Sequence, residues 1–266
     1  GDLVHSAPVT IPRAIFMHDF GVTEKYTLFL DFPITLDIER AISGGSAVDF
    51  EPQHGSRIGV MPRYGNDADV RWFDVETGVV IHTANAWDDG DEVVLQASRS
   101  KTADIAGAGT SEGNNLQENQ GRLYEWRIDL KTGAVAERTL SEIPCDFTRV
   151  NDNFACYPTR YLYAGVFNTE RPFTFDGIMK YDNDTGVTTE FQYGVNRHGG
   201  EAVFAPRTGT GSEDDGYLVC FIHDEAKKQS ECLIIDAQNL SAGPVATVIM
   251  PFRVPYGFHA GWVSGE

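Results

Sequence analysis

Tyr124-Glu125-Trp126-Arg127-Ile128-Asp129, followed by Leu130-Lys131-Thr132-Gly133, predicts more about the structure of this 266-residue chain than any other stretch. The first six residues alternate hydrophobic and polar side chains, which is the two-residue period of a β-strand. The aspartate at the end can accept hydrogen bonds from turn amides, and the glycine can take the positive φ that a tight turn needs. The stretch therefore predicts a strand that leads into a hairpin.

The same unit recurs along the chain. Strand-like runs that end in aspartate are found at residues 70–74, 178–182 and 232–236. The turn sequences that follow are Val75-Glu76-Thr77-Gly78, Asn183-Asp184-Thr185-Gly186 and the degenerate Asn239-Leu240-Ser241-Ala242-Gly243. The four aspartates are evenly spaced, since 129 − 74 = 55, 182 − 129 = 53 and 236 − 182 = 54. This period is typical of β-propeller blades, and the alternative is a chance spacing of common turns.

We therefore predict an all-β fold in which residues 1–266 form a single domain. A closed ring of six or seven such blades needs more than 266 residues. The chain is thus expected to supply about four to five blades of a partial β-propeller whose N-terminal blades are missing. Residues 101–120 are rich in Gly, Ser, Thr and Asn and predict a long surface or mobile loop.

The composition excludes several classes of partner. The formal net charge of −18 argues against nucleic acid and anionic membrane, because both attract surfaces rich in Lys and Arg. No stretch approaches the roughly 20 apolar residues of a spanning helix, and Gly1-Asp2-Leu3 does not resemble a signal peptide. The four cysteines contain no CxxC pair, so we expect free thiols in a reducing compartment and predict a cytoplasmic protein.

Three of the seven histidines lie in apolar surroundings. His18 follows Ala14-Ile15-Phe16-Met17, His82 follows Val79-Val80-Ile81, and His259 follows Tyr256-Gly257-Phe258. A buried imidazole must be neutral and hydrogen-bonded, or it must bind a metal. Singly, each is more often a hydrogen-bonded core histidine. Together they are candidate metal ligands at the ends of separate blades.

The segments around the first two histidines resemble motifs of the carotenoid cleavage oxygenases. Met17-His18-Asp19-Phe20-Gly21-Val22-Thr23-Glu24 is similar to the family's histidine-aspartate-phenylalanine segment, which is followed closely by Thr-Glu. His82 with Asn85-Ala86-Trp87 and Asp88 resembles the family's His-x-x-Asn-Ala segment.

The third histidine segment resembles the family's C-terminal Gly-Phe-His-Gly motif, with Ala260 where glycine is common. The three motifs occur in the family's order and cover almost the whole chain. Intermediate segments agree with the family pattern as well: Phe147-Thr148-Arg149-Val150-Asn151, Gly199-Gly200-Glu201-Ala202-Val203-Phe204 and Glu213-Asp214-Asp215-Gly216.

The resemblance implies a seven-bladed propeller that holds one Fe(II) on its axis with four histidines, three of them His18, His82 and His259. It also implies carboxylates that accept the other ring N–H of ligand histidines. Glu201 falls on one such position, and Asp146 falls where the family usually has glutamate, so that a water could complete the shorter contact. In the alternative interpretation, Glu201 is a solvated loop carboxylate and Asp146 is a turn former.

The family's first ligand lies upstream of the His-Asp-Phe segment, in a stretch that this chain does not contain. His5 is too close to His18 to belong to an earlier blade and is interpreted as a loop residue. His54, His198 and His223 lack the apolar setting of the other three and are predicted to lie on the surface or in loops. A chain that holds three of the four ligands is not assumed to be active by itself.

The activity that the resemblance implies is a non-haem Fe(II) dioxygenase that cleaves a carbon–carbon double bond of a carotenoid or apocarotenoid with O₂, giving two carbonyl products. The partners would be O₂ and an apolar small molecule in a tunnel lined by aromatic side chains. Phe20, Trp87 and Phe258 are candidates for that lining, and the alternative for each is ordinary core packing. Any peripheral membrane contact would come from parts not in this chain.

Three alternatives stay open. The substrate could be a stilbene, which the same family also cleaves. The chain could belong to a non-catalytic β-propeller that serves as a binding module with structural histidines. It could also belong to a degenerate family member that binds a lipid without cleaving it. Iron content would distinguish a dioxygenase from the binding module. Product formation would distinguish a dioxygenase from the degenerate member.

Overall fold

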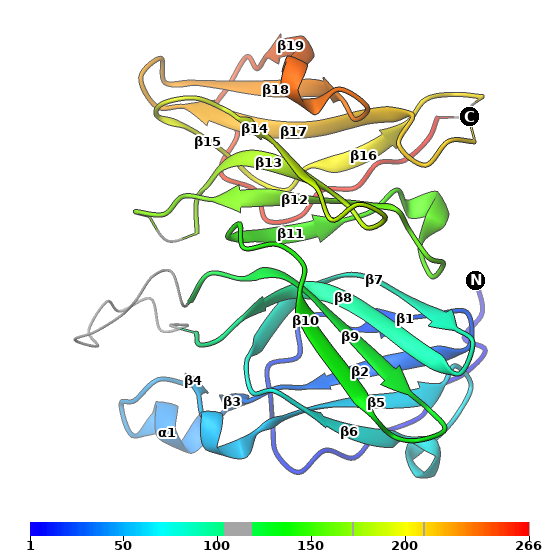
Figure 1. Cartoon of the computed structure of the whole chain (residues 1–266). Coiled ribbons are helices and arrows are strands. Elements are labelled where there is room, and N and C mark those ends of the chain that lie inside the picture. Colours follow the sequence, from blue (N-terminus) through cyan, green and yellow to red (C-terminus); the bar gives the residue numbers. More distant parts are fainter. Residues whose placement is uncertain (104–118, 172, 210, 266) are drawn as a thin grey trace.

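The chain folds into antiparallel β-sheets, as the strand pattern predicts (Figure 1). The computed structural model describes residues 1–103, 119–171, 173–209 and 211–265. These residues contain one α-helix, α1 (Ile38–Ile42), and four short 3₁₀ turns, η1 (Pro52–His54), η2 (Asp67–Asp69), η3 (Asp152–Phe154) and η4 (Leu240–Ala242). None of their helices is long and apolar enough to cross a bilayer.

Two four-stranded sheets form the lower half of the molecule in Figure 1. The first has the order β1-β2-β5-β6, made of β1 (Gly21–Val22), β2 (Tyr26–Asp31), β5 (Ser56–Pro62) and β6 (Arg71–Val75). The second has the order β10-β9-β8-β7, made of β7 (Val79–Asp89), β8 (Glu92–Ser100), β9 (Arg122–Asp129) and β10 (Val135–Thr139). A small ribbon, β3 (Ile34–Leu36) with β4 (Val48–Phe50), projects with α1 beside the first sheet.

The upper half is one nine-stranded sheet. Its strands are β11 (Cys145–Arg149), β12 (Tyr161–Phe167), β13 (Phe175–Asp182), β14 (Thr188–Gln192), β15 (Arg197–Gly199), β16 (Val203–Pro206), β17 (Gly216–Asp224), β18 (Gln229–Asp236) and β19 (Pro244–Ile249). β11 to β14 pair in sequence, as do β16 to β19, and β15 joins the two groups by pairing with both β13 and β17. The nine-stranded sheet is therefore two four-stranded units connected by one short strand.

Three of the four predicted turns lead from one strand to its antiparallel neighbour. Asp129 accepts hydrogen bonds from the amides of Lys131 (2.7 Å) and Thr132 (2.9 Å), and Gly133 has a φ of 79°. The turns after Asp182 and Asp236 follow the same rule: each aspartate accepts the amide two residues on, at 2.9 Å in both cases. In these three units the aspartate and its glycine have the predicted roles.

The prediction for the first unit is wrong. Val75-Glu76-Thr77-Gly78 joins the last strand of the first sheet to the first strand of the second, so it is a crossover between sheets. Gly78 is not among the glycines with positive φ. The close approach of β8 requires glycine here instead, since a Cβ would lie 2.7 Å from the carbonyl oxygen of Ser100.

The equivalent strand of the first sheet is β5, which ends at Pro62. Measured between equivalent strand ends, the intervals are 129 − 62 = 67, 182 − 129 = 53 and 236 − 182 = 54. The long first interval contains residues 101–120, so the even spacing from Asp74 was a coincidence. Most of that predicted loop, residues 104–118, lies outside the described residues. At its end Gln120 is buried and donates to the carbonyl oxygen of Asn168.

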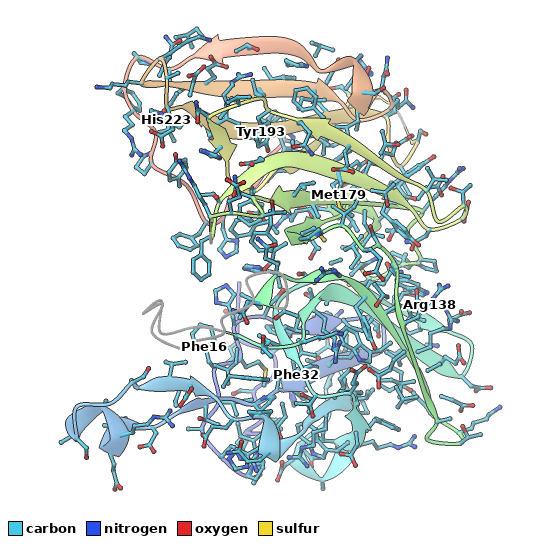
Figure 2. The ribbon with its side chains drawn as sticks, turned by 60° about the vertical axis from the view of Figure 1, so that its left-hand side comes forward. Phe16, Phe32, Arg138, Met179, Tyr193 and His223 are labelled. Atoms are coloured by element: carbon cyan, nitrogen blue, oxygen red, sulfur yellow. The ribbon has the colours of Figure 1, made fainter. Side chains whose placement is uncertain are left out.

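Three clusters of buried side chains hold the sheets together. The first packs the two lower sheets against each other around Trp126, Leu28 and Ile58, and it includes Phe32 (Figure 2). The second, which includes Tyr193, packs Tyr163 of β12 and Ile178 of β13 against side chains of β16 to β18. The third joins the halves of the molecule, because it combines Leu123 of β9 with Met179 of β13. The boundary between β7 and β11 is thereby fixed by packed apolar side chains.

Candidate metal centre

The three histidines singled out from the sequence lie on two kinds of backbone, one in a strand and two in irregular segments. His82 is part of β7, an eleven-residue strand. His18 lies in the segment before β1, where only Ile15 makes a β-bridge, to Thr35. His259 lies in residues 250–262, which follow β19 without regular secondary structure and are called the C-terminal strap below. Only one ligand is therefore held in place by a strand.

All three imidazoles converge at the boundary between the two halves. One nitrogen from each ring lies within 4.8 Å of the other two. The Nε2 atoms of His18 and His259 are 3.3 Å apart, and the ring centroids of His82 lie 5.0 Å from His18 and 4.9 Å from His259. Two nitrogens that each lie about 2.1 Å from one metal ion are separated by roughly 3 to 3.4 Å. The spacing of His18 and His259 therefore suits a shared ion.

His82 has the hydrogen-bonding pattern of a metal ligand. Its Nδ1 donates to Asp146 Oδ1 at 3.0 Å, which fixes the tautomer because a carboxylate only accepts. Its Nε2 is buried, and no described residue hydrogen-bonds to it. A lone pair buried without a partner costs free energy unless something binds it. The aspartate reaches the ring directly, so the shorter side chain needs no bridging water.

Glu201 is buried behind His259 and divides its two oxygens between different partners. Oε2 lies 3.5 Å from His259 Nδ1 and accepts the backbone N–H of Ala260 at 2.6 Å. Oε1 pairs with Arg149 at 3.4 Å. The carboxylate is thus held from both sides, and it fixes the C-terminal strap at the residue that follows the histidine. Glu201 thus lies beside a candidate ligand, and its role in orienting that imidazole stays a prediction.

Burial and neighbouring charges shift the pKa values of two of the imidazoles in opposite directions. The pKa of His18 is lowered, first by burial and then by the neighbouring His82 and His259, which favours the neutral form that binds metals. Burial also lowers the pKa of His82, but the hydrogen bond and negative charge of Asp146 outweigh it, and the net pKa is raised. The same carboxylate makes that imidazole a stronger donor to a metal.

A β-bulge brings Asp146 and Arg149 to the same site. In a regular strand, residues three apart point to opposite faces. The pairing of β11 with β12 shifts register, because Asp146 faces Gly165 whereas Arg149 faces Tyr163. Phe147 absorbs the extra residue with a φ of 53°, which is rare for a bulky side chain. Both charged groups consequently reach the imidazoles, one at His82 and the other through Glu201.

The aromatic residues nearest the imidazoles differ from those singled out from the sequence. Phe147 contacts His82 and His259 with centroids at 5.1 and 5.6 Å, and Phe16 stacks on His18 at 5.8 Å. Phe16 lies at the boundary between the two halves (Figure 2). Proximity in sequence to a histidine therefore did not identify Phe147. A phenylalanine next to a second candidate, Asp146, was the signal that could have identified Phe147.

The three aromatic residues predicted to line a tunnel differ in their exposure to solvent. Phe20 and Phe258 are 52% and 76% exposed, whereas Trp87 is 7% exposed and packs in the protein interior. The role of these three side chains in a tunnel stays a prediction.

Other motif residues have structural roles. Asn85 donates to the carbonyl oxygen of Tyr157 (2.8 Å) and accepts the amide of Cys156 (3.0 Å), which binds the loop after η3 to β7. Thr23 donates to Asp88 at 2.9 Å, so the motif containing His18 is tied to the motif containing His82.

The prediction that His198 and His223 lie on the surface is wrong. They face each other on β15 and β17 and are only 4% and 5% exposed. Nδ1 of His198 donates to Asp176 (2.6 Å), and Nδ1 of His223 contacts Ser230 Oγ (3.0 Å). His223 lies near the end of β17 in the upper sheet (Figure 2). Cross-strand partners bury these rings, and single-strand sequence patterns do not reveal such partners. All four cysteines are free thiols.

Sequence comparison relates this chain to oxygenases. A family model described as retinal pigment epithelial membrane protein matches residues 1–264. The carotenoid 9,10(9',10')-cleavage dioxygenase of Crocus sativus is 38% identical over 279 aligned residues, which cover 97% of this chain and 50% of that protein. The chain therefore spans about half the length of the curated relatives it matches.

Two solved structures share the fold of this chain. The lignostilbene dioxygenase of Pseudomonas brassicacearum has a TM-score of 0.90 and 28% identity, covering 100% of this chain and 58% of that one. A cobalt-substituted apocarotenoid oxygenase of Synechocystis has a TM-score of 0.84 and 28% identity, covering 94% and 53%.

Proposed function

This chain belongs to the carotenoid cleavage oxygenase family, and on that premise we propose that the intact protein is a non-haem Fe(II) dioxygenase. The observation that carries the proposal is the convergence of three imidazole nitrogens within 4.8 Å at the junction of the two halves of the fold. The free Nε2 of His82, with Asp146 on its other nitrogen, supports a metal at this point. We further propose that the sheets are blades of a seven-bladed propeller with these histidines near its axis.

In this proposal, His18, His82 and His259 hold the iron, and the fourth imidazole that the family uses is assigned to no residue of this chain. Fe(II) bound to neutral imidazoles supplies open positions at which O₂ can react. Asp146 and Glu201 keep His82 and His259 in the tautomers that present a lone pair to the metal. Phe147 covers these two rings and keeps water from that side.

The proposed reaction adds both atoms of O₂ across one carbon–carbon double bond, which breaks and leaves two carbonyl products. A carotenoid or apocarotenoid is the favoured substrate class, supported by the Crocus relative. A stilbene is the second candidate, supported by the lignostilbene dioxygenase, whose fold matches this chain with a TM-score of 0.90. A cytoplasmic location and a peripheral membrane contact outside this chain remain predictions.

The experiment is an anaerobic Fe(II) titration of the intact metal-free protein beside His259→Ala, with His54→Ala as the matched control. His54 is exposed on η1 and lies away from the three imidazoles. We expect one tightly bound iron in the wild type and in the control, and at least a tenfold weaker affinity in His259→Ala. A panel of carotenoids and stilbenes, with O₂ uptake and carbonyl products measured, then separates the two substrate classes. Equal iron binding by all three proteins would refute the metal centre and leave the binding-module alternative.

A further inference from the structure

We propose that Asp19 is a positioning residue that fastens the segment carrying His18 onto β7, beside His82, before any metal binds. This inference rests on the metal centre of the proposed function. It assigns to Asp19 a task that is separate from ligation, since its carboxylate is already occupied by protein donors.

The segment before β1 has few other attachments. On the side of the first sheet, Phe16 donates its amide to the carbonyl oxygen of Ile34 at 2.7 Å, next to the bridge between Ile15 and Thr35. After that point the backbone runs without a strand until Gly21. His18 lies in this stretch and is exposed. A histidine on an unsupported, exposed segment would sample many orientations, which weakens a metal site.

Asp19 supplies the missing attachment of this segment. Its Oδ2 accepts two hydrogen bonds from Thr83, one from the backbone N–H at 2.8 Å and one from Oγ1 at 2.7 Å. Its Oδ1 accepts the backbone N–H of Phe20 at 2.8 Å. Three donors on one carboxylate are charge-assisted hydrogen bonds of good length, which are stronger than neutral ones. The contact connects the residue after one candidate ligand with the residue after another.

The geometry of β7 makes Thr83 available as the anchor. β7 is the edge strand of its sheet, so one side of its backbone has no strand partner. The pairing with β8 also shifts register on both sides of Thr83. An irregular edge of this kind leaves an amide free for a side-chain acceptor. Asp19 supplies that acceptor and so sets the distance between the backbones of His18 and His82.

Two variants at Thr83 and one at Asp19 separate this role from general structural damage. Asp19→Asn preserves the shape, but its amide group has a single acceptor oxygen and turns an NH₂ toward at least one of the three donors. Thr83→Val removes the hydroxyl and keeps the backbone N–H, whereas Thr83→Ser restores the hydroxyl. Asp49→Asn, on the exposed β4 ribbon, is the matched charge control.

The test is an anaerobic Co(II) titration of the intact metal-free proteins, followed by visible absorption, whose bands report coordination geometry. We expect Asp19→Asn to bind Co(II) about 10- to 100-fold more weakly with shifted bands, which is the range found when residues behind ligands are changed. Thr83→Val should lose part of this affinity, and Thr83→Ser and Asp49→Asn should match the wild type. Unchanged affinity and bands in Asp19→Asn, or equal losses in Thr83→Val and Thr83→Ser, would overturn the proposal.

A second measurement does not depend on metal. In the metal-free proteins, amide hydrogen exchange of residues 16–20 should be faster in Asp19→Asn than in the wild type, while exchange of the β8 amides stays the same. Equal exchange in this segment would refute the fastening even if metal binding changed. A wild-type protein that binds no Co(II) would refute the metal centre, and the exchange result would still decide the role of Asp19.

Discussion

Replacing Gly200 by alanine should weaken metal binding by displacing the C-terminal strap. Gly200 lies between β15 and β16, one residue before Glu201, and it contacts the strap at Gly257. A Cβ at position 200 would lie 2.8 Å from the carbonyl oxygen of Gly257 and 3.5 Å from its carbonyl carbon. Both atoms belong to backbone, so no side-chain rotation can relieve the contact. Gly257 is two residues from His259.

The size of the displacement follows from these distances. Carbon–oxygen contacts in proteins begin at about 3.3 Å, so the strap must move by about 3.3 − 2.8 = 0.5 Å. Metal–ligand distances tolerate only about 0.2 Å. A shift more than twice that large at the strap is expected to lower metal affinity about 10- to 100-fold, the effect typical of a disturbed ligand support.

The strap should yield before the sheet does. Phe258 and Trp262 on the strap are exposed, at 76% and 46%, so few packed contacts resist the movement. If the strap moves, the free energy of unfolding changes little. If it holds, the added methyl overpacks the contact and costs about 1–3 kcal/mol of stability instead. Measuring metal affinity and urea unfolding on the same samples separates the two responses.

Gly257→Ala is the matched control for this variant. It adds the same methyl group to the other partner of the contact, yet a Cβ there meets nothing within 4 Å. The assay is the anaerobic Co(II) titration of the intact protein. A Gly200→Ala protein that binds Co(II) as tightly as Gly257→Ala would refute the reasoning, because the strap position would then not depend on this close approach.

Two further predictions concern the carboxylates. Asp146→Asn replaces an acceptor of the Nδ1 proton of His82 by an amide that can turn its NH₂ toward the ring, so Co(II) affinity should fall about 10- to 100-fold; equal affinity in the same titration would show that the tautomer is fixed elsewhere. The hydrogen bond from Arg160 lowers the pKa of Asp182 from 3.8 to about 2. A lowered pKa stabilises the fold above the unfolded value, so this contribution is complete above about pH 4 and is lost as the pH falls through about 2. Arg160→Gln should return the pKa of Asp182 toward its usual range, read from the carboxyl ¹³C shift, and an unchanged titration would contradict the assignment.

The parts of the fold that follow from local rules could be predicted from the sequence. Asp129 and Gly133 define their hairpin because the side chain and the backbone conformation act within five residues. The same rule failed at Asp74, because the Asp-x-x-Thr-Gly pattern there lies in a crossover between two sheets and not in a hairpin. Which strands pair is decided by contacts across the sheet, and the sequence of one strand carries little information about them.

The candidate site divides in the same way. His82 and its carboxylate Asp146 followed from motif resemblance, and the structure brings them to 3.0 Å. Arg149 was missed because its orientation depends on a bulge centred on Phe147, a bulky residue with positive φ that no local preference favours. His198 was assigned to the surface because its neighbours in sequence are polar, whereas β13 and β17 bury it on both sides.

The residue after each candidate ligand has the same task in all three segments. Asp19, which follows His18, accepts two hydrogen bonds from Thr83, which follows His82. Ala260, which follows His259, donates its N–H to Glu201. A metal ion needs side chains from distant parts of the chain at fixed separation. Fixing the backbone next to each ligand is the most direct way to fix that separation. This explains why alanine can stand where the family commonly has glycine. Position 260 contributes a main-chain N–H, which alanine supplies as well as glycine. Position 19 needs a carboxylate because its oxygens accept the N–H and the hydroxyl of Thr83 together with the N–H of Phe20.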